Sequence, residues 1–311
     1  MVTNLGLIGA GKWGRNYIKT INKFPDINLV KILSKNHETR QIAPSNSQIF
    51  SDLDEFLNTE GIDGAIIASP PETHAEIAIK LINKKIPIII EKPLTTSYKD
   101  ALEIFSAAKK NSGIVLVDHI FLYHPIFRYL KKYINQKGKI KFIKSEGGGL
   151  GPFRENISGL WDWGPHDISM CLDIVDSMPI NIFAEKIKQN NPKSNYGEIV
   201  KINLEFENQI HAEILTGNNF PNKKRNFTIS KTDEIITFNP LTEHKLVIKN
   251  FDNYDDKKFK YIEKNNFQEL PLDILIKDFC KYIHEGDTNI SDLNLGLNVI
   301  KILEDIENIY C

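Results

Sequence analysis

The first third of the chain alternates short apolar runs with helical patterns. The runs that predict strands cover residues 5–8, 27–33, 47–50, 64–68, 87–90 and 114–117. Between them, apolar residues recur at three- and four-residue spacing, as Ala75, Ala78 and Ile82 do, which predicts helices. Buried strands that alternate with helices indicate βαβ units and a parallel sheet covered on both faces.

The pattern changes after about His119. Val200, Ile202 and Leu204 alternate with polar residues, which predicts a half-buried antiparallel strand with one face in water. Further strands are expected at 227–229, 235–238 and 246–248, and helices at 126–134, 272–283 and 293–309. We therefore predict an α/β protein of two domains. Residues 1–118 form a parallel-sheet domain, and residues 119–311 form an α+β domain with an open, mainly antiparallel sheet.

Length and charge fit this organisation. A chain of 311 residues is long enough for two domains. A net charge of −1 gives no overall attraction to nucleic acid or to an acidic membrane, and we expect neither as a partner. The densest basic cluster is formed by Lys223, Lys224 and Arg225. We interpret it as a solvated turn, with a phosphate contact as the alternative.

The cysteines and the start of the chain bear on the compartment. Residues 1–4 lack the charged segment of a secretory signal, and no apolar run approaches the roughly 18 residues of a membrane span. Cys171, Cys280 and Cys311 are few, distant and odd in number, which favours free thiols in a reducing compartment. We expect a cytoplasmic protein and no metal site.

A glycine motif follows the first predicted strand and precedes a helix. Gly9-Ala10-Gly11-Lys12-Trp13-Gly14 has the spacing of a dinucleotide-binding turn. Gly9 allows the tight turn, Gly11 lets the backbone approach a pyrophosphate, and Gly14 allows close packing of helix and strand. The helix N-terminus attracts phosphates. A plain glycine turn is the alternative, but the βαβ context favours a Rossmann domain that binds NAD(P)(H) through this motif.

The segment after the second strand bears on the choice of dinucleotide. NAD sites place an acidic residue about twenty residues past the glycines. This chain has Ser34-Lys35-Asn36 there, with no carboxylate. A hydroxyl followed by a cation suits a 2′-phosphate better, so Ser34 and Lys35 favour NADP(H) over NAD(H).

Three further segments carry a resemblance that extends over essentially the whole chain. They are Ser69-Pro70-Pro71-Glu72-Thr73-His74, Glu91-Lys92-Pro93 and Asp162-Trp163-Gly164-Pro165-His166. In this order after the glycine motif, they resemble the glucose–fructose oxidoreductase/inositol dehydrogenase/MocA family. The resemblance implies a cofactor-dependent oxidoreductase whose dinucleotide lies along Ser69, Pro70, His74, Glu91 and Lys92.

The oxidation of a secondary alcohol needs a hydride acceptor and a base for the hydroxyl proton. Lys92 follows a buried strand and is expected at the carboxyl edge of the sheet, where open α/β sheets bind ligands. Asp162 and His166 share a face one turn apart if their segment is helical. We predict Lys92 and His166 as the proton-transfer pair, with Asp162 supporting His166 or contacting substrate. A helix cap at Asp162 and a metal pair formed by Asp162 and His166 are the alternatives.

Single residues near the domain junction are candidates for substrate binding. The family places substrate contacts around His119 and Tyr123, and Arg154 can hold a carboxylate or a phosphate with two hydrogen bonds. Ordinary packing or solvation is the alternative for each.

Within the family, several segments resemble the 3-dehydrogenases of UDP-linked uronic acids. They include 118–125, 161–169, 220–228 and the last two helices. The resemblance implies oxidation of the sugar C3 hydroxyl and a sugar or nucleotide-sugar substrate. An inositol or aldose dehydrogenase, a 3-ketosugar reductase and a non-catalytic NAD(P)-binding regulator stay open. We expect a homo-oligomer by analogy with the fold.

Overall fold

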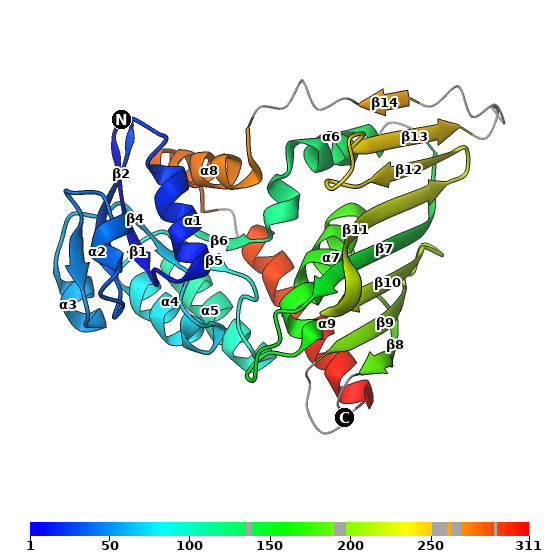
Figure 1. Cartoon of the computed structure of the whole chain (residues 1–311), viewed down its shortest axis with the longest axis horizontal. Helices are drawn as coiled ribbons and strands as arrows, with labels where there is room; N and C mark the ends of the chain where they lie inside the picture. Colours follow the sequence, from blue (N-terminus) through cyan, green and yellow to red (C-terminus); the bar gives the residue numbers. More distant parts are fainter. Residues whose placement is uncertain (135–137, 190–196, 251–259, 263–268, 289–290, 311) are drawn as a thin grey trace. The chain divides into compact units, whose positions relative to one another are not determined.

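A computed structural model describes the chain except for residues 135–137, 190–196, 251–259, 263–268, 289–290 and 311 (Figure 1). The chain forms two compact units. Unit 1 contains Met1–His119 and Leu272–Ile300, and unit 2 contains Ile120–Pro271 and Lys301–Cys311. Residues 272–300, expected in the second domain, therefore pack within unit 1. Cys311 lies outside the described residues.

Unit 1 is built on a parallel sheet of six strands in the order β3-β2-β1-β4-β5-β6. The strands are β1 (Thr3–Ile8), β2 (Ile27–Leu33), β3 (Gln48–Phe50), β4 (Gly64–Ile67), β5 (Ile88–Glu91) and β6 (Val115–Asp118). The helices are α1 (Lys12–Ile21), α2 (Thr39–Ile42), α3 (Leu53–Asn58), α4 (His74–Asn83), α5 (Tyr98–Asn111) and α8 (Pro271–Glu285), and α9 (Ser291–Tyr310) contributes residues to both units. Every residue of β4, β5 and β6 is buried, as their fully apolar runs predict.

The strand order reverses at the centre of this sheet. β1 pairs with β2 on one side and with β4 on the other, all in parallel. In doubly wound sheets, this reversal opens a crevice at the carboxyl ends of the strands.

Helix α8 closes against the same sheet. A Cβ at Gly64 in β4 would lie 2.8 Å from the ring of Phe279 in α8. Phe279 is itself fully buried. This close contact explains why a segment far along the sequence belongs to unit 1.

Unit 2 contains a mixed sheet whose described strands follow the order β14-β13-β12-β11-β7-β10-β9-β8. Only β7 and β10 pair in parallel among the pairs described, which confirms the expected open, mainly antiparallel sheet. The strands are β7 (Ile140–Leu150), β8 (Asn181–Gln189), β9 (Glu198–Glu205), β10 (His211–Gly217), β11 (Asn219–Lys231), β12 (Glu234–Phe238), β13 (Leu246–Asn250) and β14 (Lys260–Ile262).

Helices α6 (Pro125–Ile134) and α7 (Gly159–Val175) pack on this sheet. α7 lies against β7, β9 and β10 and carries the predicted Asp162 and His166. In β9, Val200, Ile202 and Leu204 are buried, while Lys201, Asn203 and Glu205 are partly exposed, as the alternating pattern predicts. No helix in the described parts of the chain has the length and apolar character of a bilayer span.

Candidate functional site

The glycine turn after β1 has no room for side chains at its ends. Gly9 has a φ of +98°, and a Cβ there would lie 2.6 Å from the carbonyl oxygen of Ala68. A Cβ at Gly14 would lie 2.0 Å from the carbonyl oxygen of Gly9. These two glycines are therefore required by the backbone itself.

Gly11, between them, is different. A Cβ at Gly11 would meet no atom within 4 Å, so the turn faces open space there. Gly11 is the N-cap of α1, whose first turn contains Lys12 and Trp13, has no side-chain cap and contains no acidic residue. The first amides of α1 and the positive end of its dipole are thus available to an anion. This arrangement fits the pyrophosphate of a dinucleotide.

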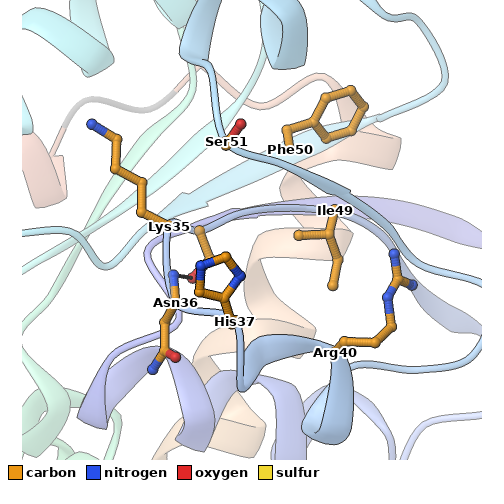
Figure 2. A pocket seen from close by; sticks show the side chains of 8 residues that line it. Lys35, Asn36, His37, Arg40, Ile49, Phe50 and Ser51 are labelled. Atoms are coloured by element: carbon orange, nitrogen blue, oxygen red, sulfur yellow. Dashed lines mark hydrogen bonds between the residues drawn. The ribbon is translucent and has the colours of Figure 1, made fainter.

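A pocket of about 310 Å³ lies at the carboxyl ends of β2 and β3 (Figure 2). It is lined by Ser34, Lys35, Asn36, His37, Arg40, Ile49, Phe50 and Ser51. Lys35 and Arg40 are exposed, and no carboxylate is among the lining side chains. The pocket is therefore suited to an anionic group.

The hydrogen bonds around the pocket hold its shape. The hydroxyl of Ser34 is bonded to that of Thr39 at 2.8 Å and accepts from the amide of Asn36 at 3.2 Å. Arg40 donates to the carbonyl oxygen of Ser47 at 3.1 Å. Sequence reasoning found Ser34 and Lys35 but missed His37, which precedes α2, and Arg40, which lies on this short helix. Their basic character so close to Lys35 was the available signal.

The loops after β4 and β5 are joined by His74. Its ring is fully buried, with Nε2 3.0 Å from the carbonyl oxygen of Ser69. Nδ1 lies 3.1 Å from the carbonyl oxygen of Pro93 and 3.3 Å from that of Leu94. Burial lowers the pKa of His74. The ring thus holds together the two loops that carry Ser69, Pro70 and Lys92.

The ends of β5 and β6 place Glu91, Lys92, Asp118 and His119 side by side. Glu91 and Asp118 are register partners, and the Lys92–Pro93 peptide bond is cis. His119 is 2 % exposed, and neither ring nitrogen has a hydrogen-bond partner among the described residues. Burial, and then the charge of Lys92, lower the pKa of His119 to about 3. His119 is therefore a neutral imidazole near pH 7, with one donor and one acceptor for a ligand.

In unit 2, the structure confirms a helix over Asp162 and His166, which places them one turn apart on α7. Asp162 accepts from Arg154 at 3.4 Å, so two of the predicted residues form an ion pair. His166 is buried, and its ring meets Phe121 edge-on, with centroids 5.1 Å apart.

A buried ion pair anchors α7 next to His166. Asp167 accepts hydrogen bonds from Ser145 at 2.7 Å, from Thr216 at 3.0 Å and from Arg225 at 3.3 Å. A Cβ at Gly147 would lie 2.2 Å from a carboxylate oxygen of Asp167. The helix is thereby fixed to β7, β10 and β11.

Arg225 corrects a prediction from the sequence. The basic cluster at 223–225 lies in strand β11 rather than in a solvated turn, and Arg225 is 4 % exposed. Its guanidinium lies 4.5 Å from the ring centre of Phe121 and 5.1 Å from that of Trp163. Phe121 therefore contacts both Arg225 and His166.

The remaining substrate candidates differ in exposure. Tyr123 is buried, with the guanidinium of Arg128 4.9 Å from its ring centre. The side chain of Arg154 is 44 % exposed and accessible to a ligand. Unit 1 thus brings together the predicted cofactor residues, Lys92 and His119, and unit 2 brings together Arg154, Asp162 and His166. The described residues contain no cluster of three or more side chains able to hold a metal ion.

The parallel sheet, its reversal and the glycine turn define a dinucleotide-binding Rossmann domain. Residues 3–119 match the Gfo/Idh/MocA model, described as an oxidoreductase family with an NAD-binding Rossmann fold. Residues 3–119 of unit 1 are therefore similar to the NAD-binding domain of the Gfo/Idh/MocA oxidoreductases.

Individual proteins show the same relationship. A putative oxidoreductase of Magnetospirillum magnetotacticum is 29% identical, with a TM-score of 0.88 over 98% of this chain and 99% of its own. UDP-N-acetylglucosamine 3-dehydrogenase GnnA of Acidithiobacillus ferrooxidans is 18% identical, with a TM-score of 0.85 over 99% and 98%, and shows the fold alone. The scyllo-inositol 2-dehydrogenase (NADP(+)) IolU of Bacillus subtilis is 29% identical over 43% of this chain and 42% of its own length. The chain spans 60 to 65% of the curated relatives with the longest matches.

Gly11 and Gly14 give a matched pair of variants. We expect Gly11→Ala to fold normally, because its Cβ has open space, but to weaken dinucleotide binding at least about tenfold by filling the phosphate cradle. Gly14→Ala should lower thermal stability as well, because its Cβ meets the backbone. Calorimetric titration and thermal unfolding measure both effects. Unchanged affinity in Gly11→Ala would place the dinucleotide elsewhere.

The buried His119 should make stability depend on pH. Its pKa is about 3 in the folded chain against an ordinary value of 6.5, so the unfolded chain binds more protons between these values. Its stabilising contribution is complete above about pH 6.5 and is lost as the pH falls toward 3, by about 1.4 kcal/mol per pH unit. Urea unfolding at several pH values in this range gives the free energy of unfolding as a function of pH. This free energy should fall less steeply with falling pH in His119→Asn than in the wild type. Equal slopes would mean that His119 charges freely in the folded state.

Proposed function

We propose that this protein is an NAD(P)-dependent oxidoreductase that transfers a hydride between the nicotinamide and a secondary alcohol carbon of a sugar. The proposal is supported above all by the residues at the carboxyl edge of the parallel sheet in unit 1. The open cradle at Gly11 and Lys92 at the end of β5 both lie at the carboxyl ends of one parallel sheet. Ligands bind at this edge in doubly wound folds.

The bound dinucleotide supplies the hydride acceptor or donor. Lys92 holds the reacting hydroxyl and stabilises the alkoxide that develops on its oxygen. His166 accepts the hydroxyl proton and returns it in the reverse direction. Asp162 orients His166 or contacts substrate. The low pKa of His119 supports this assignment, because a neutral imidazole of that kind binds by hydrogen bonds and is a poor base near pH 7.

The pocket after β2 supports NADP(H) as the preferred dinucleotide. Lys35 and Arg40 supply cations for a 2′-phosphate, and Ser34 ties the loop that presents them. The nearby carboxylate of Glu38 is paired with Arg15 at 2.9 Å and does not line the pocket. An NADP(+)-dependent relative, the inositol dehydrogenase IolU, is consistent with this preference.

A UDP-linked uronic acid, oxidised at C3, is the substrate we favour. The exposed Arg154 suits a sugar carboxylate or a phosphate, and it pairs with Asp162 in the first turn of α7, the helix that also carries His166. The fold shared with a UDP-N-acetylglucosamine 3-dehydrogenase is consistent with a nucleotide sugar. An inositol or aldose dehydrogenase, a 3-ketosugar reductase and a non-catalytic regulator are the alternatives. We also propose that the protein is cytoplasmic and forms a homo-oligomer.

Turnover and its loss in two variants test the proposed reaction. We expect nicotinamide absorbance to change with UDP-uronic acids and to change little with free polyols or aldoses. Lys92→Ala and His166→Asn should each lower kcat by about 100-fold or more, because each removes a proton-handling group. In His166→Asn the dinucleotide affinity should stay near that of the wild type. Turnover with free polyols alone would favour the inositol branch. Tight dinucleotide binding with no turnover of any substrate would favour the regulator.

Arg40 tests the preference for NADP(H). Arg40→Ala removes a charge-assisted hydrogen bond and should weaken NADPH binding by about tenfold or more, with little effect on NADH. Lys109→Ala, an exposed cation on α5 outside the pocket, is the control. Fluorescence titration with NADPH and with NADH measures the ratio of the two dissociation constants. A wild type that prefers NADH, or an Arg40→Ala variant that loses both equally, contradicts the assignment.

A further inference from the structure

Two buried carboxyl groups meet beside Lys92. Glu91 ends β5 and Asp118 ends β6, and the two residues are partners in the parallel register. Glu91 is 6 % exposed and Asp118 is 1 % exposed. Burial, and then the charge of Asp118, raise the pKa of Glu91, and Oε1 of Glu91 and Oδ1 of Asp118 are buried with no other partner among the described residues. A carboxyl–carboxyl hydrogen bond needs a proton on one of the two partners.

Tyr17 of α1 completes the cluster. Its ring is fully buried, and its hydroxyl donates to Oδ2 of Asp118 at 2.7 Å. The phenol is held neutral, since burial and then the charge of Asp118 raise its pKa. Tyr17 therefore acts as a fixed donor toward Asp118 from the helix that begins at the glycine turn.

The donors decide which carboxyl group carries the proton. Burial raises the pKa of both groups, so they cannot both ionise cheaply at the same place. The hydrogen bonds from Tyr17 and from Glu91 both lower the pKa of Asp118, whereas the bond to Asp118 raises that of Glu91. Because Asp118 already accepts the hydroxyl of Tyr17 at 2.7 Å, we assign the proton of the pair to Glu91.

The surrounding charges agree with a single negative charge. The charge of Lys92 favours the ionised form of both carboxyl groups. His119, the next residue after Asp118, is held neutral by its low pKa. A protonated Glu91 and an ionised Asp118 therefore balance one ammonium group, and a second negative charge would have no buried cation among these residues to offset it.

We propose that Glu91, Asp118 and Tyr17 form a positioning cluster in which Glu91 carries a proton and Asp118 carries the one negative charge behind Lys92. The cluster holds the ammonium group of Lys92 at the sheet edge in the orientation that binds the reacting alcohol. Its role in turnover depends on the proposed function, whereas the location of the proton does not.

Two isosteric variants separate the two carboxyl groups. Glu91→Gln keeps a neutral donor in place of the protonated acid, so the hydrogen bond to Asp118 should persist while the protonated carboxyl group is lost. Asp118→Asn removes the negative charge and should lower kcat at least tenfold, with little change in KM or dinucleotide affinity. The pH profile of kcat should move in Asp118→Asn relative to the wild type. Tyr17→Phe removes one hydrogen-bond donor from Asp118 and should lower kcat by a smaller factor. This variant replaces Asp118→Asn in the test if Asp118→Asn does not fold.

Infrared spectroscopy locates the proton without any turnover. The wild type should show the band of a protonated carboxylic acid near neutral pH. The band should vanish in Glu91→Gln and persist in the control Glu103→Gln, which alters an exposed carboxylate of α5. Absence of the band, or its loss in Asp118→Asn with retention in Glu91→Gln, would overturn the proton assignment. Equal kcat values for Asp118→Asn and the wild type would overturn the positioning role. A wild type that turns over no substrate would contradict the proposed function instead, and the infrared result would still decide the proton assignment.

Discussion

Parallel strands of one sheet all end at the same edge, and the candidate site of unit 1 depends on this constraint. The glycine turn follows β1, the cationic pocket follows β2 and β3, and the loops joined by His74 follow β4 and β5. Lys92 and His119 follow the last two strands. Residues distant in the sequence are brought to one edge because they lie in the segments that follow parallel strands of the same sheet.

Unit 2 orients its candidate residues by a different interaction, the ion pair between Arg225 and Asp167. Both side chains are at most 4 % exposed, and removing one partner of such a pair leaves an uncompensated buried charge. Buried ion pairs add little net stability, so we attribute this one to geometry: it fixes α7 against three strands next to His166. In unit 1, Glu91 and Asp118 also place buried charge next to a candidate catalytic residue.

The sequence predicted the parallel sheet of unit 1 well because its strands contain long apolar runs and glycine is required at Gly9 and Gly14 by backbone contacts. It missed β7, which contains Gly147 to Gly149, and left α7 conditional because Gly164 and Pro165 disfavour helices. Arg225 and Asp167 are 58 residues apart and meet only because α7 packs on the sheet that contains β11, and Arg40 enters its pocket only through the turn of α2. Such tertiary contacts leave no periodic signal. The roles of Lys92 and His166 rest on resemblance and chemistry and stay predictions.

The most direct test of the proposed function follows the hydride itself. A UDP-uronic acid deuterated at C3 would be incubated with NADP⁺ and the protein, and the reduced dinucleotide would be analysed by NMR. The account predicts deuterium at C4 of the nicotinamide ring, because the C3 hydride is transferred directly between the two carbons. A reduced dinucleotide without deuterium, or deuterium retained at C3 of the sugar with no reduction, would contradict it.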